Sequence, residues 1–232
     1  MRKRLASALA FPFEDREWPS KIAIGGAVGL AAEALFVAAG FLFSRELALA
    51  ASPLALVANF PALGFVLQVF QGALRAPQAH AMPEWRRWND LCLKGLLLFM
   101  LALGYGVVPL LFMVSGLGLF VRGGAAMVLG LIMMLLAMLA GLVLGFFLPM
   151  AVARYLEGRR VEAAFHPIVI WQNIRKVLAE YMAAYLAAIA AFIFVGLIGT
   201  VPFLGALAWP FLAFYLMVAG ARLFGGVCLG AA

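Results

Sequence analysis

The sequence predicts an all-α integral membrane protein with six transmembrane helices in three hairpins, each preceded by an amphipathic helix at the cytoplasmic membrane surface. Two observations predict this class. The 232 residues are 67% hydrophobic and only 12% charged, whereas a soluble domain is about half apolar and about a quarter charged. The charges also lie in a few short segments, between uncharged stretches as long as a bilayer crossing requires. We therefore expect a single transmembrane domain over residues 1–232.

A segment with tryptophan and basic residues occurs three times, and each copy runs directly into long apolar sequence. We call residues 11–21, 83–94 and 165–176 the first, second and third pre-hairpin segments. Tryptophan and nearby basic residues are enriched at the headgroup level, so we expect these segments to lie on the membrane surface. Their recurrence indicates pseudo-repeats at about 1–76, 77–160 and 161–232. The candidate interfacial or partner-docking residues are Trp18, Lys21, Trp85, Arg86, Arg87, Trp88, Trp171, Arg175 and Lys176.

In each of the first two predicted hairpins, a short polar turn joins the two helices. Residues 22–43 and 47–74 form the first pair, with a turn at residues 44–46, and Pro61 falls inside the second helix. Residues 95–121 and 125–153 form the second pair, with a turn at residues 122–124. A proline inside a helix removes one backbone hydrogen bond, so we expect a bend at Pro61 and at Pro109.

The last apolar stretch is too long for one crossing. Residues 181–221 contain no charged residue, and as one helix they would be about 60 Å long, twice the hydrocarbon thickness. Residues 199–202 include a glycine and a proline, which favour a turn. We therefore expect two further spanning helices that meet there.

The basic residues predict the orientation. Fifteen of the 17 Lys and Arg residues lie in the N-terminal segment, in the two long polar segments or after the last span. The turns on the other side contain only Arg45 and Arg122. Because cytoplasmic loops carry an excess of Lys and Arg, both termini are expected in the cytoplasm.

The pre-hairpin segments resemble a known family. The first carries Phe11, Phe13, Asp15, Trp18, Lys21, Ile22, Ile24, Gly25 and Gly26 at the spacing of its N-terminal signature; the second carries Pro83, Glu84, Trp85, Trp88, Lys94 and Gly95; the third carries Phe165, Pro167 and Asn173. This pattern is similar to prokaryotic polytopic membrane proteins catalogued as domain of unknown function number four thousand and thirteen. The resemblance implies a multi-pass fold in the prokaryotic cytoplasmic (inner) membrane and supplies no activity. Arg86 and Arg87 stand where the family often has acidic residues, which puts any shared partner of that loop in doubt.

Glu33 is the candidate intramembrane polar site. It lies twelve residues after Lys21, about 18 Å along a helix and so near the middle of the bilayer. An ionisable group at that depth is costly unless it finds a partner. Two interpretations remain open: a proton or cation site, or a carboxyl that forms a hydrogen bond with a neighbouring helix.

The sequence predicts no catalytic, cofactor-binding or metal site. His80 and His166 both lie outside the spans, and Cys92 and Cys228 show no ligand spacing, so we expect neither a haem held within the bilayer nor a zinc ion. The motifs of serine hydrolases, zinc proteases and nucleotide-binding loops are absent from the sequence. The net charge of +7 is gathered beside apolar stretches, which indicates anionic lipid headgroups and no nucleic acid.

Two functions follow as expectations. The first is a non-catalytic structural, assembly or accessory subunit that docks other membrane-protein subunits. The alternative is a transporter or channel for a small apolar or lipid-like solute. The sequence alone does not decide between them.

Overall fold

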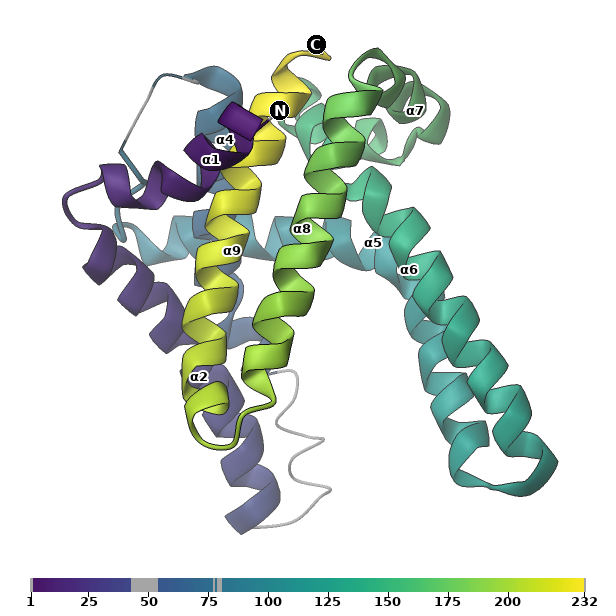
Figure 1. Ribbon diagram of the computed structural model, residues 1–232. Coiled ribbons are helices and arrows are strands. Elements are labelled where there is room, and N and C mark those ends of the chain that lie inside the picture. The colour runs from purple at the N-terminus through teal and green to yellow at the C-terminus, as the bar shows by residue number, and fades with distance from the viewer. Residues whose placement is uncertain (1, 43–53, 77, 79–80, 232) are drawn as a thin grey trace. The chain divides into compact units, whose positions relative to one another are not determined.

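The computed structural model describes residues 2–42, 54–76, 78 and 81–231, and its described secondary structure is helical. The elements are α1 (Arg2–Ala10), η1 (Phe11–Glu14), α2 (Trp18–Leu42), α4 (Phe60–Arg75), α5 (Trp88–Val121), α6 (Gly124–Gly158), η2 (Val161–Phe165), α7 (Pro167–Lys176), α8 (Leu178–Gly199) and α9 (Leu204–Leu229). Figure 1 shows their order along the chain. The predicted all-α class is confirmed for the described residues.

Five helices in the described part of the chain are long and apolar enough to cross a membrane. They are Leu54–Arg75, Trp88–Val121, Gly124–Gly158, Leu178–Gly199 and Leu207–Leu229. These helices contain the second to sixth predicted spans, or the described portions of them. The first predicted span lies in α2 but is not among the five, and the turn expected at residues 44–46 lies outside the described residues.

The chain forms two compact units. Unit 1 comprises Met1–Phe99 and Ile174–Ala232, and unit 2 comprises Met100–Asn173. The pseudo-repeats proposed from the sequence remain a prediction.

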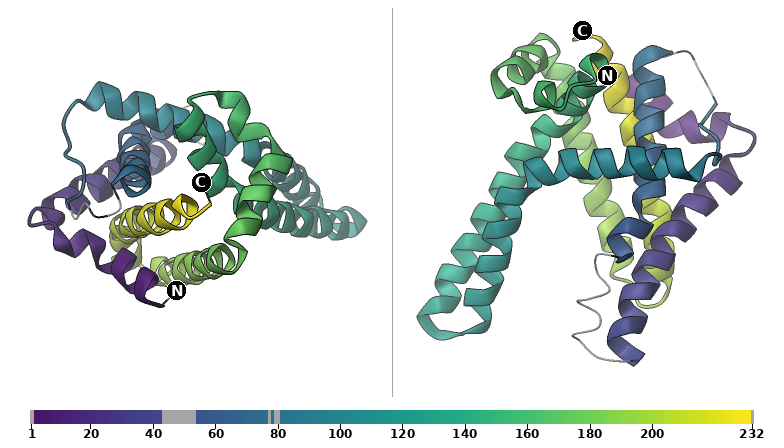
Figure 2. Two further views of the ribbon diagram at one scale, coloured as in Figure 1. Left: turned by 90° about the horizontal axis from the view of Figure 1, so that it is seen from above. Right: turned by 180° about the vertical axis from the view of Figure 1, so that it is seen from behind.

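In unit 1, α9 is the central helix. It packs against α2, α4, α8 and α1, and Figure 2 shows it between α4 and α8 when seen from above. Glycines allow large side chains to enter these interfaces. The rings of Phe214 and Phe211 occupy the space that side chains would need at Gly25 and Gly26 of α2. Close packing through glycine is a main source of helix association in lipid.

The start of α5 crosses α4 at two more glycines. A Cβ atom at Gly64 of α4 would lie 1.9 Å from the carbonyl oxygen of Leu91, and a Cβ at Gly95 of α5 would lie 1.8 Å from the carbonyl oxygen of Phe60. The two backbones are therefore in direct contact. Figure 2 shows this part of α5 running across α4.

Unit 2 is a hairpin with a helical cap. The turn at Arg122 and Gly123 joins α5 to α6, and Gly123 has a φ of 72° that glycine tolerates best. Gly116 and Gly130 bring the two helices together near this turn, because a Cβ at Gly130 would lie 2.6 Å from the Gly116 carbonyl oxygen. At the other end, the Tyr105 hydroxyl donates a hydrogen bond to the carbonyl of Ala164 in the η2 helix.

The predicted turns at residues 122–124 and 199–202 are confirmed, but two boundaries differ from expectation. Helix α5 begins at Trp88, seven residues before the predicted span, so no separate helix precedes it in the second pre-hairpin segment. Pro61 lies in the first turn of α4, after a break at Asn59. A proline is tolerated there because the first-turn N–H groups have no helical partner.

Candidate functional site

A buried ion pair joins the first and second pre-hairpin segments. Asp15 follows η1, and its carboxylate accepts hydrogen bonds from the Lys21 ammonium, the backbone N–H of Glu17 and the backbone N–H of Met82, each at 2.8 Å. Asp15 is 8% exposed and Lys21 is 6% exposed. Two charges this deeply buried are tolerated only when they are paired and hydrogen-bonded, as they are here.

Further hydrogen bonds complete what we call the Asp15–Lys21 cluster, formed by Asp15, Lys21, Met82 and Trp85. The Lys21 ammonium also donates to the Met82 carbonyl at 3.1 Å. In the opposite direction, the Trp85 indole N–H donates to the Lys21 carbonyl at 3.0 Å. Residues more than sixty positions apart are thus held together by backbone and side-chain bonds, so the cluster is chiefly a structural connection.

The electrostatics of Asp15 follow from these contacts. Burial raises the pKa of its carboxyl. The hydrogen bonds from Lys21, Glu17 and Met82, together with the charge of Lys21, lower the pKa by more, so it lies below the ordinary value of 3.8. Asp15 is therefore ionised at neutral pH. It is an unsuitable general acid, because its carboxylate is occupied by three donors.

Aromatic rings connect the Asp15–Lys21 cluster to the helices of unit 1. Trp85 stacks on Phe65 with a centroid separation of 4.6 Å and on Trp88 at 5.4 Å. Phe214 of α9 lies 5.9 Å from Trp85. Trp18 lies against Phe13 at 4.8 Å. These tryptophans contribute to packing as well as to any headgroup contact predicted from their positions.

The third pre-hairpin segment is divided between the units. Trp171 belongs to unit 2, where its ring lies 6.3 Å from that of Phe147. Lys176 belongs to unit 1 and donates to the Ala231 carbonyl at 2.9 Å. Arg175 is exposed. The structure therefore brings Lys21, Trp85 and Trp88 together in unit 1, whereas the third pre-hairpin segment is divided between the two units.

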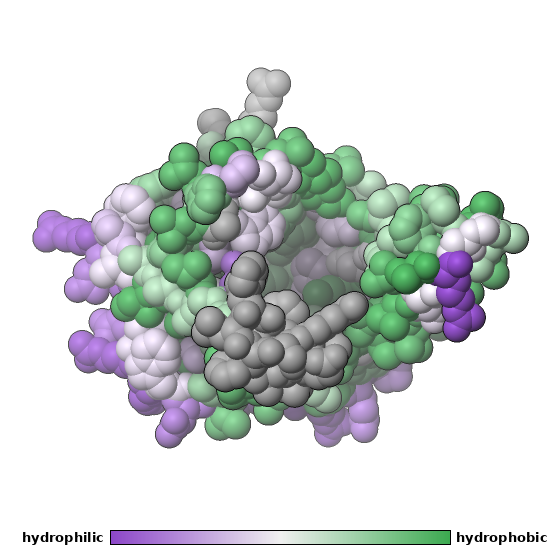
Figure 3. All heavy atoms as spheres, turned by 90° about the horizontal axis from the view of Figure 1, so that it is seen from below, coloured by the Kyte–Doolittle hydropathy of each residue, from purple (hydrophilic) through white to green (hydrophobic). Residues whose placement is uncertain are grey.

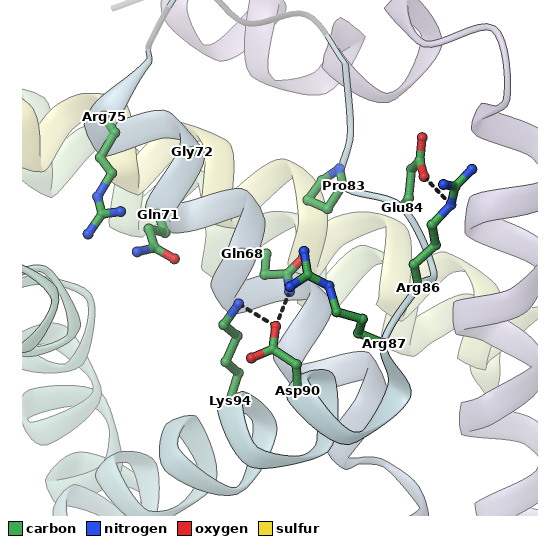
Figure 4. Close-up of a pocket in the computed structure, with 10 residues that line it drawn as sticks. All are labelled: Gln68, Gln71, Gly72, Arg75, Pro83, Glu84, Arg86, Arg87, Asp90 and Lys94. Carbon is green, nitrogen blue, oxygen red and sulfur yellow. Dashed lines mark hydrogen bonds and ion pairs between the residues drawn. The ribbon is translucent and has the colours of Figure 1, made fainter.

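A cavity of about 730 Å³ lies beside this region, between α4, residues 83–87 and the start of α5. We call it the α4–α5 pocket, and Figure 4 shows its lining. Its charged lining residues are four basic and two acidic: Arg75, Arg86, Arg87, Lys94, Glu84 and Asp90. Gln68, Gln71, Gly72 and Pro83 complete the lining. Only Arg86 and Arg87 had been identified from the sequence as candidate site residues.

The sequence contains a signal that could have identified the α4 wall of the pocket. Gln68, Gln71 and Arg75 follow one another at spacings of three and four, which places them on one face of a helix. A polar stripe at the end of an otherwise apolar span indicates a face that is not covered by lipid or by the protein core.

Glu33 lies on α2 with an exposed side chain. Among the described residues of unit 1, none forms a hydrogen bond or ion pair with its carboxyl. The described residues also contain no group of three or more His, Cys, Asp or Glu that could hold a metal ion. Cys92 and Cys228 are not joined in a disulfide.

Comparison with known proteins identifies a family and no closer relative. A family model described as "Protein of unknown function (DUF4013)" matches residues 47–204. This region contains the second and third pre-hairpin segments and excludes the first. Neither a curated protein nor a solved structure matches the chain.

Proposed function

The chain belongs to the DUF4013 family of proteins of unknown function, and from this premise we propose that it is a non-catalytic accessory or assembly subunit of a membrane complex. In this proposal six helices in three hairpins cross the prokaryotic inner membrane, with both termini in the cytoplasm. The distribution of Lys and Arg supports that orientation, since fifteen of 17 would be cytoplasmic. Helix α2 would be the first span.

The observation that carries the proposal is the exposure of Glu33 on α2. A carboxyl within the hydrocarbon region is costly unless another polar group satisfies it. No described residue of unit 1 does so. A neighbouring membrane subunit with a basic or hydrogen-bond-donating side chain at the same depth would meet this requirement.

The α5–α6 hairpin supports the same function. Leu111 and Val114 on α5 and Val128 on α6 are at least 60% exposed within the protein, and Figure 3 shows hydrophobic residues over much of the described surface on one face. Such helices need lipid or another apolar helix around them. They provide lateral surface for assembly in addition to α2.

A photo-crosslinking experiment in cells tests the proposal. A photoreactive amino acid is placed at Ala34, next to Glu33 and also exposed. We expect one discrete crosslinked membrane protein, which also co-purifies with the chain in constant stoichiometry. The matched control carries Glu33→Gln as well, and we expect its crosslinking yield to fall several-fold. Crosslinks to lipid alone, or a yield that does not depend on Glu33, would contradict the proposal.

Transport of a small apolar or lipid-like solute is the alternative. The α4–α5 pocket favours this less, because charged and amide side chains dominate its lining. Solute or proton flux into liposomes containing the purified chain decides the matter: flux that Glu33→Gln abolishes would support transport and not assembly.

A further inference from the structure

The α4–α5 pocket holds more positive charge than its own carboxylates neutralise. Glu84 forms an ion pair with Arg86, and Asp90 forms one with Lys94 at 2.8 Å. Arg75 and Arg87 remain. When the Gln71 amide is turned so that its oxygen faces Arg75, this oxygen accepts hydrogen bonds from the Arg75 guanidinium at 3.0 and 3.1 Å. Arg87 forms no ion pair with a described residue. The lining therefore has a net charge of +2.

The backbone directs Arg87 into this space. Arg87 has a φ of 54°, in the left-handed region that non-glycine residues adopt at a cost. Its carbonyl accepts hydrogen bonds from the N–H groups of Asp90 at 2.9 Å and Leu91 at 3.2 Å, which hold the conformation. Figure 4 shows the consequence: Arg86 extends toward Glu84, whereas Arg87 points toward Gln68 on α4.

The chemistry of these groups favours a phosphate ester. Arginine presents a planar set of donors that matches two phosphate oxygens at once. Gln68 and Lys94 add further hydrogen-bond donors to the lining. The volume of about 730 Å³ lies within the range of pockets that hold small organic groups, so a phosphate together with its attached alcohol fits.

The surroundings favour a lipid as the source of that phosphate. On the same first turns of α5, Leu93 is 68% exposed and Leu96 is 40% exposed, and neither lines the pocket. Arg75, which lines the pocket, is the last residue of the candidate membrane span Leu54–Arg75. Headgroups lie at the ends of membrane-spanning helices, so this position suits a lipid headgroup.

We propose that the α4–α5 pocket binds the phosphodiester headgroup of an anionic phospholipid through Arg87 and Arg75. Lys94 and Gln68 assist, and the acyl chains lie along the apolar face of α5. This inference concerns the isolated chain and does not depend on docking of a partner subunit at Glu33.

Lipid binding to the purified full-length chain tests the proposal. The delipidated protein in an uncharged detergent is titrated with phosphatidylglycerol, and bound lipid is counted by native mass spectrometry. Since a basic residue near the membrane surface contributes about 1 kcal/mol of attraction, we expect the double variant Arg75→Gln, Arg87→Gln to bind roughly 25-fold more weakly. The matched control is Arg16→Gln, Arg122→Gln, which removes the same charge from exposed residues outside the pocket. Because neither of these residues lines the pocket, this control should bind the lipid with almost unchanged affinity.

The other outcomes would overturn the proposal. Equal weakening in both double variants would show non-specific attraction, and equal binding of phosphatidylcholine would show that the anionic charge is not recognised. If millimolar inorganic phosphate displaced the bound phosphatidylglycerol completely, the pocket would be a site for a free anion and not for a lipid. If the double variant does not fold, the exposed single variant Arg87→Gln replaces it, with an expected loss of about fivefold against Arg16→Gln.

Discussion

Asp15 and Lys21 are the two charged residues whose removal should harm stability most. Asp15→Asn removes the buried carboxylate that pairs with the Lys21 ammonium and leaves only the exposed Glu17 carboxylate 3.9 Å away. Breaking one side of a buried pair typically costs about 3 to 5 kcal/mol. We therefore expect a large fall in the thermal unfolding midpoint, measured in detergent. Glu84→Gln is the matched control, because its ion pair with Arg86 is exposed and should contribute less than about 1 kcal/mol. Similar midpoints for the two variants would refute the structural role of the buried pair.

The same pair predicts how stability depends on pH. Folding lowers the pKa of Asp15 below its ordinary value of 3.8. The ionised carboxylate therefore contributes its full stabilisation above pH 3.8, and this contribution is lost as the pH falls through the lowered pKa of the folded state. The thermal unfolding midpoint of the wild type should therefore fall more steeply below about pH 4 than the midpoint of Asp15→Asn. Parallel pH profiles for the two proteins would contradict this expectation.

Glu33 allows a test of whether its partner lies within the chain. In the purified protein without a partner subunit, we expect Glu33→Leu to raise the unfolding midpoint, because a carboxylate in the hydrocarbon region costs about 2.5 to 3.5 kcal/mol. Ala34→Leu, at the neighbouring exposed position, is the size control and should have little effect. A lower midpoint for Glu33→Leu would place a bonded partner inside the chain.

At the scale of single residues, the sequence indicated candidate side chains but could not indicate their contacts. Lys21 and Trp85 were identified as interfacial candidates, yet Lys21 is buried and bonded to residues far along the chain. Helical periodicity reports only on neighbours within one helix. The bond from Trp85 to Lys21 spans 64 positions, so no local pattern could have indicated it.

The helix crossing between α4 and α5 should be intolerant of any side chain at its glycines. Gly64→Ala or Gly95→Ala places a methyl group within 2 Å of a backbone oxygen, so the helices must separate, at an expected cost of about 1 to 3 kcal/mol. The measurement is the thermal midpoint in detergent. Gly72→Ala on the same helix is the control, since nothing lies within 4 Å of its added Cβ. A Gly64→Ala variant as stable as Gly72→Ala would show that the crossing does not form.

The accuracy of the predicted helix ends depends on local chemistry. The turns at residues 122–124 and 199–202 were predicted correctly, because Gly123 and Pro202 favour turn conformations whatever their neighbours are. The beginning of α5 was missed. Trp88 to Lys94 carry no helix-stopping residue before the apolar stretch, so the amphipathic turns and the span form one continuous helix. Likewise Pro61 lies in the first turn of α4, where the sequence alone suggested a bend inside a longer helix.

For the whole molecule, thiol labelling in intact cells tests the proposed orientation. Both native cysteines are replaced by Ala, and single cysteines are placed at Arg122, Arg45 or Arg16. We expect a membrane-impermeant maleimide to label Arg122→Cys and Arg45→Cys from outside the inner membrane, and to label Arg16→Cys only after permeabilisation. External labelling at Arg16, or protection at Arg122, would be incompatible with three hairpins and cytoplasmic termini.

The membrane class could be predicted for the whole molecule because hydropathy is a property of composition. The two compact units could not. Their boundaries fall inside α5 and α7, at positions where the helices continue without interruption. A unit boundary within a helix leaves no turn residue or composition change, because it is set by contacts between segments distant in sequence.

The bonds between Asp15 and Met82 have a consequence for biosynthesis. Asp15 and Lys21 are synthesised more than sixty residues before Met82 and Trp85, a delay of roughly 3 to 12 seconds at ordinary translation rates. During that interval the N-terminal segment lacks two of the backbone partners that stabilise its charges. The Asp15–Lys21 cluster can therefore be completed only after residues 82–85 have been synthesised, so that the N-terminal segment reaches its final packing only after this delay.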